Sequence, residues 1–172
     1  MGEVRETILS RFETARTSID IICFEVSSAD VIDILRKRYA EGVKVSVRCE
    51  HRKIGDGLLA LAECAPDIRL QTSEPNQAYY ALHEKLILID DDVLLFGTFN
   101  LSEVSFEQNA ELLFETIHPT HLSAARKHFK ELDHSLAKMR NHGPYSECLD
   151  VKGAPKMRRN LAFPSLAKKR HT

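Results

Sequence analysis

Hydrophobic and polar residues in the first half of the chain alternate between the period of a helix and that of a strand. Apolar residues first recur at the spacing of one helical face, at Val4, Ile8, Phe12 and Ala15. The run SIDIICFEV that follows is strand-like. Ser28 can then cap a second helix, which Gly42 ends before VKVSVRC alternates apolar with polar positions. A short helix over DGLLALAEC and a strand over IRLQT extend a pattern that predicts parallel β-α-β units.

The second half of the chain predicts strands that follow one another closely. Residues 81–89 and 93–98 are two apolar runs around three aspartates at 90–92, which can form a tight turn. NAELLFETI predicts a third strand after a polar loop, and an amphipathic helix is expected over about residues 119–140. We therefore expect an α/β fold in which a mixed, largely parallel central sheet is flanked by helices on both faces.

Length and composition fit one folded domain followed by a tail. The chain has 172 residues, of which 43% are hydrophobic, enough to bury a substantial core. We assign a single domain to residues 1–143 and a basic, peripheral or partly ordered tail to 144–172. The formal net charge of −1 gives no global sign of a polyanion binder, so any positive charge that binds phosphate must be local.

Cysteine usage and the absence of long apolar runs indicate the compartment. The cysteines form no CxxC pair and no zinc-ligand spacing; they are Cys23, Cys49, Cys64 and Cys148. This favours inert thiols in a reducing compartment. No stretch approaches the roughly 18 apolar residues of a membrane span, and the first residues are too charged for a signal peptide. We expect a soluble, cytoplasmic protein, unless a targeting segment precedes this sequence.

Three neighbouring segments each carry two polar residues two positions apart. The pairs are His83 and Lys85, Thr98 and Asn100, and Asn109 and Glu111. Residues two apart on a strand point to the same side, so an imidazole and an ammonium could touch one phosphate. Gly97 leaves room for backbone or substrate beside the second pair. Taken singly, these residues have ordinary explanations as a core histidine, a solvated lysine, turn-forming asparagines and an edge-strand charge.

Taken together, the residues resemble the HxKx4Dx6G(S/T)xN signature of the phospholipase D superfamily. Every defined position is occupied: His83, Lys85, Asp90, Gly97, Thr98 and Asn100. The family more often has serine where Thr98 stands, and most members carry two motifs in one chain. The partial matches at His51 and His128, each followed two positions later by a lysine, lack every later motif position. We interpret both as surface basic residues.

The resemblance implies a metal-independent phosphodiesterase without a cofactor. It assigns His83 as nucleophile or general acid, with a phosphohistidine intermediate, and Lys85 and Asn100 as phosphate ligands. Thr98 is then an auxiliary hydroxyl, and Glu111 orients an imidazole. Asp90 and Gly97 are assigned structural places in the motif. Because the reaction uses two imidazoles and the chain has one complete motif, the resemblance also implies a homodimer with a shared active site.

Further residues are candidates for the substrate-binding rim. Asn109, Arg52, Lys53 and Tyr80 lie close to the motif or to a strand end, and Arg48 could line a phosphate channel with them. Surface solvation explains the basic residues equally well, and packing in the core or a loop is the favoured explanation of the tyrosine. The favoured substrate is DNA or RNA. The alternatives are a phospholipase or phosphatidyl transferase, and a catalytically silent, nucleic-acid-binding module of a larger system.

Overall fold

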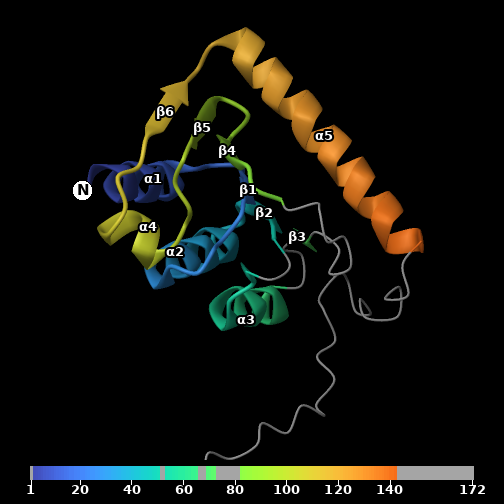
Figure 1. Ribbon diagram of the computed structural model, residues 1–172, viewed down its shortest axis with the longest axis horizontal. Helices are drawn as coiled ribbons and strands as arrows, with labels where there is room; N and C mark the ends of the chain where they lie inside the picture. Colours follow the sequence, from blue (N-terminus) through green and yellow to red (C-terminus); the bar gives the residue numbers. More distant parts are fainter. Residues whose placement is uncertain (1, 51–52, 66–68, 73–81, 143–172) are drawn as a thin grey trace, which may run out of the picture.

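The structure is a computed structural model that describes residues 2–50, 53–65, 69–72 and 82–142 (Figure 1). In chain order its elements are α1 (Glu3–Thr14), β1 (Ser18–Cys23), α2 (Ala29–Ala40), β2 (Lys44–Cys49), α3 (Asp56–Cys64), β3 (Arg69–Thr72), β4 (Lys85–Ile89), β5 (Val93–Gly97), α4 (Glu103–Glu107), β6 (Leu113–Thr116) and α5 (Pro119–His142). The tail predicted at 144–172, together with Cys148, lies outside the described residues.

The six strands form one mixed sheet in the order β3-β2-β1-β4-β5-β6. β1 pairs with β2, and β2 with β3, in parallel; β4 pairs antiparallel with β1, β5 with β4, and β6 with β5. The predicted α/β class and mixed sheet are confirmed. The expectation of a largely parallel sheet is wrong for the second half, because the tight turn between β4 and β5 can join only antiparallel strands.

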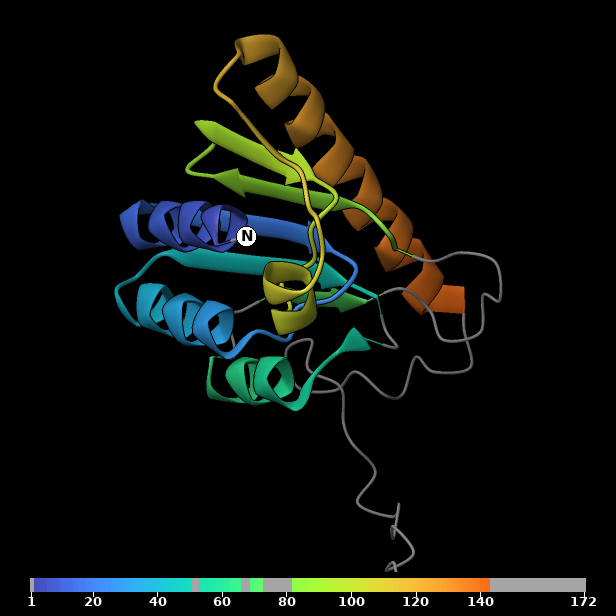
Figure 2. The same ribbon diagram turned by 60° about the vertical axis from the view of Figure 1, so that its left-hand side comes forward.

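Helices cover both faces of the sheet, as predicted (Figure 2). One face packs against α1, α2 and α3 through a core that includes Ile8, Phe12, Leu35 and Leu61. On the other face, α5 is the one helix of the described residues that lies across the sheet, and its Phe129 and other apolar residues pack on Leu88 and Leu94. Among the described residues, no helix is long and apolar enough to span a membrane.

The strands of the second half are shorter than the sequence predicts. β4 begins at Lys85 rather than at residue 81, and β6 begins at Leu113, so Asn109 and Glu111 precede the third strand instead of lying on it. β5 ends at Gly97, where an added Cβ would lie 1.9 Å from the carbonyl oxygen of Leu112. This close approach of two backbones requires a glycine. Apart from Lys85, the first residue of β4, the residues of the predicted polar pairs lie just outside the strands.

Asp90 fixes the far end of β4. Its carboxylate accepts hydrogen bonds from the backbone N–H groups of Arg16, Thr17 and Ser18, with N···O distances of 2.6–3.0 Å. Partial burial acts to raise the pKa of Asp90, but these hydrogen bonds outweigh it and hold the pKa below its ordinary value. The turn between β4 and β5 is thereby tied to the connection between α1 and β1.

Arg48 is buried in the core, which corrects the expectation that it lines a phosphate channel. The side chain donates to Asp20 on β1 at 2.9 Å and to Asp133 on α5 at 2.8 and 2.9 Å, and its guanidinium lies 5.0 Å from the centre of the Phe129 ring. Paired in this way, Arg48 anchors α5 to the sheet and has no free face for a phosphate.

Two of the cysteines are core thiols. Cys23 and Cys49 are buried neighbours on β1 and β2, and neither forms a disulfide. Burial raises the pKa of Cys23 to about 11 and that of Cys49 to about 12, so both stay protonated at neutral pH. This agrees with the inert thiols expected from the sequence.

Candidate active site

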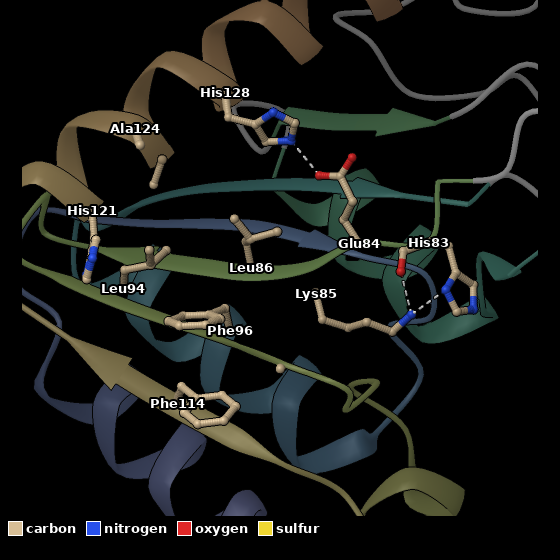
Figure 3. Close-up of a pocket in the computed structure, with 12 residues that line it drawn as sticks. His83, Glu84, Lys85, Leu86, Leu94, Phe96, Phe114, His121, Ala124 and His128 are labelled. Atoms are coloured by element: carbon tan, nitrogen blue, oxygen red, sulfur yellow. Dashed lines mark hydrogen bonds and ion pairs between the residues drawn. The ribbon is translucent and has the colours of Figure 1, made fainter.

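The motif histidine and lysine lie together where β4 begins: Lys85 is the first residue of the strand, and His83 lies two positions before it (Figure 3). Lys85 Nζ donates to the carbonyl oxygen of His83 at 2.6 Å and lies 3.2 Å from Nδ1 of the same residue. The imidazole is exposed, whereas Lys85 is 7% exposed. Burial lowers the pKa of Lys85, and nearby Cys23 and Glu111 only partly offset this effect. A buried ammonium with two weak neutral partners is a ready site for an anion.

A phenylalanine that the sequence analysis missed joins this pair to a second lysine. The ring of Phe24, just after β1, is half-buried, and its centre lies 4.9 Å from that of the His83 ring. Lys85 Nζ is 5.5 Å from the same ring centre, and Lys53 Nζ is 5.6 Å from it. Lys53 therefore lies near the His83 and Lys85 pair, and its part in binding substrate stays a prediction. Arg52 and Tyr80, the other rim candidates, lie outside the described residues.

Glu111 gathers the remaining polar groups into one network. Its carboxylate accepts hydrogen bonds from Thr98 Oγ1, from Ser105 Oγ at 2.8 Å and from Asn109 Nδ2 at 3.2 Å. Partial burial acts to raise the pKa of Glu111, but these donors outweigh it and keep the pKa below its ordinary value. Within the described part of one chain, Glu111 thus orients hydroxyl and amide groups rather than the imidazole of His83.

Ser105 is a second residue that sequence reasoning missed. Besides donating to Glu111, its hydroxyl accepts the backbone N–H of Asn100 at 2.7 Å. The side-chain oxygen of Asn100 lies 3.9 Å from the Cys23 thiol, beneath the site. Ser105 comes from α4, whose first turn is capped by Ser102. The loop after β5 is thereby held against the segment that carries Glu111.

Glu50 is also unforeseen, and it supports the chain that enters the site. This residue is 2% exposed at the end of β2, and its carboxylate accepts the backbone N–H of Leu82 at 3.1 Å. Leu82 directly precedes His83, so the hydrogen bond fixes the backbone from which the imidazole projects. A glutamate after a strand carries no sequence signal for such a contact, because its partner is 32 residues away.

An apolar groove begins at the His83 and Lys85 pair and runs between the sheet and α5. It has a volume of about 590 Å³, and its walls include Leu86, Phe96, Phe114, Ala124 and Ala125. Glu84 points to this side, away from Lys85, and pairs with His128 of α5 (Figure 3).

His128 pairs with Glu84 and keeps 42% of its side chain exposed, so it is a surface residue, as interpreted from the sequence. It also lacks the later motif positions. Separately, among the described residues no three histidine, cysteine, aspartate or glutamate side chains are grouped so that they could hold a metal ion.

Comparison with known proteins gives one family match. The sequence model of the family described as "Cardiolipin synthase, PLD-like domain" matches residues 8–133, which is well over half of the chain and includes the whole motif. No curated protein matches the sequence.

Several solved structures share the fold. NucT from Helicobacter pylori superposes with a TM-score of 0.67 at 20% identity, over 75% of this chain and 86% of that one. Nuc from Salmonella typhimurium, a phospholipase D family member, gives 0.66 at 22% identity, over 76% and 86%. TrmBL2, an archaeal chromatin protein whose structure shows a novel mode of DNA binding, superposes with a TM-score of 0.57 at 12% identity, over 78% of this chain and 50% of that one. At these identities the likeness extends to the fold alone.

Proposed function

The chain belongs to the family of PLD-like domains, and from this premise we propose that it is a phosphodiesterase, most specifically a metal-independent nuclease that cleaves DNA or RNA. One observation carries the proposal: a buried lysine lies beside an exposed imidazole, with Nζ 3.2 Å from Nδ1. Burying an ammonium costs free energy, which the nearby Glu111 carboxylate offsets only in part. A bound phosphodiester would supply further negative charge where the imidazole can reach phosphorus.

The reaction needs a nucleophile, an acid and ligands for the phosphoryl oxygens. In the proposed first step, His83 of one protomer forms a nitrogen–phosphorus bond, and the bond from phosphorus to the leaving oxygen breaks. His83 of the second protomer gives its proton to that oxygen. The same imidazole then takes a proton from water, whose oxygen bonds to phosphorus while the nitrogen–phosphorus bond breaks and frees the first His83. Lys85 and Asn100 neutralise and hold the nonbridging oxygens, and the network around Glu111 keeps Thr98 in place.

A homodimer follows from counting imidazoles. The chain has one histidine in complete motif context, and the half-buried His128 is engaged with Glu84. A two-fold axis beside the site would bring two copies of His83 to one phosphate. Mixing excess His83→Ala protomers with wild type should then suppress activity more steeply than dilution does. A linear response, with a monomeric mass at assay concentrations, would reject the shared site.

Phospholipids are the second candidate substrate. The family is described by the name of cardiolipin synthase, and the apolar groove that starts at Lys85 could accept an acyl chain. Nucleic acid is favoured because Lys53 and the aromatic ring of Phe24 lie beside the imidazole. Cations and aromatic rings bind the phosphates and bases of a nucleic acid strand.

The decisive experiment offers the full chain both kinds of substrate without free metal. Labelled single- and double-stranded DNA, RNA and phosphatidylcholine vesicles are incubated with the protein in excess EDTA. We expect cleavage of a nucleic acid, its loss in His83→Ala, and its retention in the matched control His134→Ala, another exposed histidine. Activity that EDTA abolishes and Mg²⁺ restores would contradict the mechanism. Cleavage of lipid alone would favour a phospholipase. If neither nucleic acid nor lipid is cleaved, the alternative of a catalytically silent, nucleic-acid-binding module is favoured.

A further inference from the structure

Large exposed apolar side chains gather around β6, a strand at the edge of the sheet. Phe96 on β5 and Phe114 on β6 are 38% and 52% exposed, and their rings stack with centres 5.4 Å apart. Leu112 and Ile117, on either side of β6, are 61% and 69% exposed. We call these four residues the β6 patch. Proteins rarely leave several large apolar residues together in water, so a partner or another part of the chain is expected to cover them.

The segment that carries most of the β6 patch is acidic. Residues 103–117, from α4 through β6, include four glutamates and no lysine or arginine. Glu103 and Glu107 are exposed on α4, and Glu115 on β6 pairs with Arg11 of α1. Interfaces commonly have an apolar centre with a charged rim, and the sign of the rim selects the partner. The β6 patch therefore fits a segment that has an apolar centre and basic flanks.

The C-terminal tail has this chemistry in its sequence. The large apolar residues of 161–167 are Leu161, Phe163 and Leu166. Three basic residues lie shortly before them and three shortly after: Lys156, Arg158 and Arg159, then Lys168, Lys169 and Arg170. The tail 144–172 contains seven basic and two acidic residues, whereas residues 1–143 contain 17 and 23. The tail and the folded domain thus carry opposite net charges, and we call residues 156–170 the tail segment.

We propose that the tail segment docks on the β6 patch of its own chain, with its apolar centre against Phe96 and Phe114 and its basic flanks beside the glutamates of 103–117. The length of the chain allows this. The 24 residues of α5 carry the chain about 36 Å from β6, and residues 143–160 can span up to about 60 Å. Because the segment is tethered, its effective concentration at the patch is on the order of millimolar, so weak contacts suffice to hold it.

Charge distinguishes the tail segment from other occupants of the patch. In a two-fold contact between copies the patch meets itself, so the glutamates of both copies would face one another and repel. A nucleic acid strand or an anionic lipid would meet the same negative charge. The tail segment instead brings six basic residues to these glutamates. The inference goes beyond the proposed function and does not rest on it.

The test uses fluorescence of the full chain. The sequence contains no tryptophan, so Phe163→Trp places a single reporter at the centre of the tail segment. Ala154→Trp, in the same tail but outside the segment, is the matched control. The emission wavelength and quenching by acrylamide measure how far each reporter is exposed to water. Phe114→Asp and Ile117→Asp, each added to Phe163→Trp, place a carboxylate in the patch; both positions are exposed enough for the domain to fold, which circular dichroism checks.

A second pair of variants tests the charge. Glu107→Lys, added to Phe163→Trp, reverses one charge of the acidic segment. Glu63→Lys is its control, because Glu63 is also exposed but lies on α3, which leads to β3 at the opposite edge of the sheet. Quenching is compared at low and high salt, since salt screens attraction between exposed charges.

We expect the Phe163→Trp reporter to emit at shorter wavelength and to be quenched several-fold more weakly than the Ala154→Trp control, because a tenfold preference for docking buries about nine in ten reporters. Phe114→Asp and Ile117→Asp should each return quenching to the control level. Glu107→Lys and high salt should move it part of the way, and Glu63→Lys should leave it unchanged. All these values should be independent of protein concentration.

Several outcomes overturn the proposal. If the reporter is as exposed as the control, the tail segment is not docked; sedimentation and binding to phosphatidylcholine vesicles of Phe114→Asp then show whether the patch joins two copies or binds lipid. Burial that both patch variants leave intact places the segment elsewhere, and burial that is lost on dilution means that it binds another copy. Equal quenching of Glu107→Lys and Glu63→Lys overturns the placement of the basic flanks. None of these measurements depends on cleavage, so the proposed function is tested separately.

Discussion

The two ends of strand β4 carry residues of the same sequence motif, but the fold satisfies them differently. At one end, the Asp90 carboxylate accepts three backbone N–H groups from the α1–β1 connection. At the other end, the buried ammonium of Lys85 has a carbonyl oxygen and a ring nitrogen as partners, both from the exposed His83. The charge of Asp90 is satisfied by backbone donors, so Asp90 stabilises the fold. The buried ammonium of Lys85 has neutral hydrogen-bond partners, so it can still bind an anion.

The largest effect should come from His83→Ala. Because the imidazole is exposed, its removal should leave the free energy of unfolding within about 0.5 kcal/mol of wild type. Loss of the nucleophile should lower kcat by about 10³-fold or more. Urea unfolding and single-turnover cleavage measure the two quantities on the same sample. A folded variant with full activity would remove His83 from the site, and a trapped adduct that survives acid but not alkali would argue against phosphohistidine.

Lys85→Met should separate catalysis from stability at the same end of β4. Activity should fall about 10²- to 10³-fold, because a cation beside the phosphoryl oxygens is lost. Stability should not fall, since methionine fills similar space without burying a charge. The pKa of Lys85 is lowered in the fold, so below that pKa the unfolded and folded chains are both protonated and the full cost of the buried charge applies.

The pH dependence of that comparison has a definite sign. As pH rises through the folded pKa of Lys85 toward its ordinary value near 10.5, the unfolded chain binds more protons, and wild type should gain stability relative to Lys85→Met. Urea midpoints of both proteins between about pH 8 and pH 10 measure this difference. Parallel curves over that range would show that the ammonium is not desolvated in solution.

Asp90→Asn should have the opposite profile. Asparagine keeps the shape but cannot accept three N–H groups as a charged carboxylate does, so we expect a loss of about 1 to 3 kcal/mol in stability. Activity per folded molecule should stay unchanged. Because the folded pKa of Asp90 is depressed, the stabilisation is present above its ordinary pKa and is lost as pH falls through the folded value. The difference in the free energy of unfolding between Asp90→Asn and wild type should therefore shrink as pH falls. If this difference does not change with pH, Asp90 does not stabilise the fold through its charge.

The sequence was sufficient where the information is local. The motif spacing identified His83 and Lys85 as neighbours, and the turn-like run of aspartates placed Asp90 away from them. The same turn implied antiparallel pairing of β4 with β5, so the largely parallel sheet was an avoidable error, made by extending the β-α-β pattern of the first half to the whole chain.

Information was missing where partners are far apart in sequence. From the sequence, Arg48 looks like an exposed basic residue near the end of a strand, and its burial depends on Asp133, 85 residues later on α5. Ser105 and Phe24 acquire their places only when α4 and the end of β1 meet the motif segment. Periodicity indicates which side of a strand a residue faces. It does not indicate which distant element lies there, and tertiary packing decides that.

Substitution of Phe24 should have the smallest effect on activity. It tests whether His83 and Lys85, at the first end of β4, depend on a neighbouring aromatic ring. Lys53 and Lys85 lie 5.6 and 5.5 Å from the ring centre, and the His83 ring is in contact with it. Phe24→Leu keeps apolar volume but removes the ring quadrupole. Activity should therefore fall about three- to tenfold, in line with roughly 0.5–1 kcal/mol per cation–π contact. Phe24→Tyr should restore it.

The matched control for Phe24 is Phe129→Leu, because the Phe129 ring also has a cation, Arg48, 5.0 Å from its centre. That pair lies in the core between β2 and α5, so its loss should lower stability and leave kcat and KM unchanged in the folded fraction. For Phe24→Leu the prediction is reversed: kcat should fall while the urea midpoint moves little. If both variants lose stability alone, Phe24 is a packing residue like Phe129. The ordering of Lys85 and His83 must then come from Glu50 and the backbone of Leu82, since the Glu50 carboxylate holds the chain that enters the site.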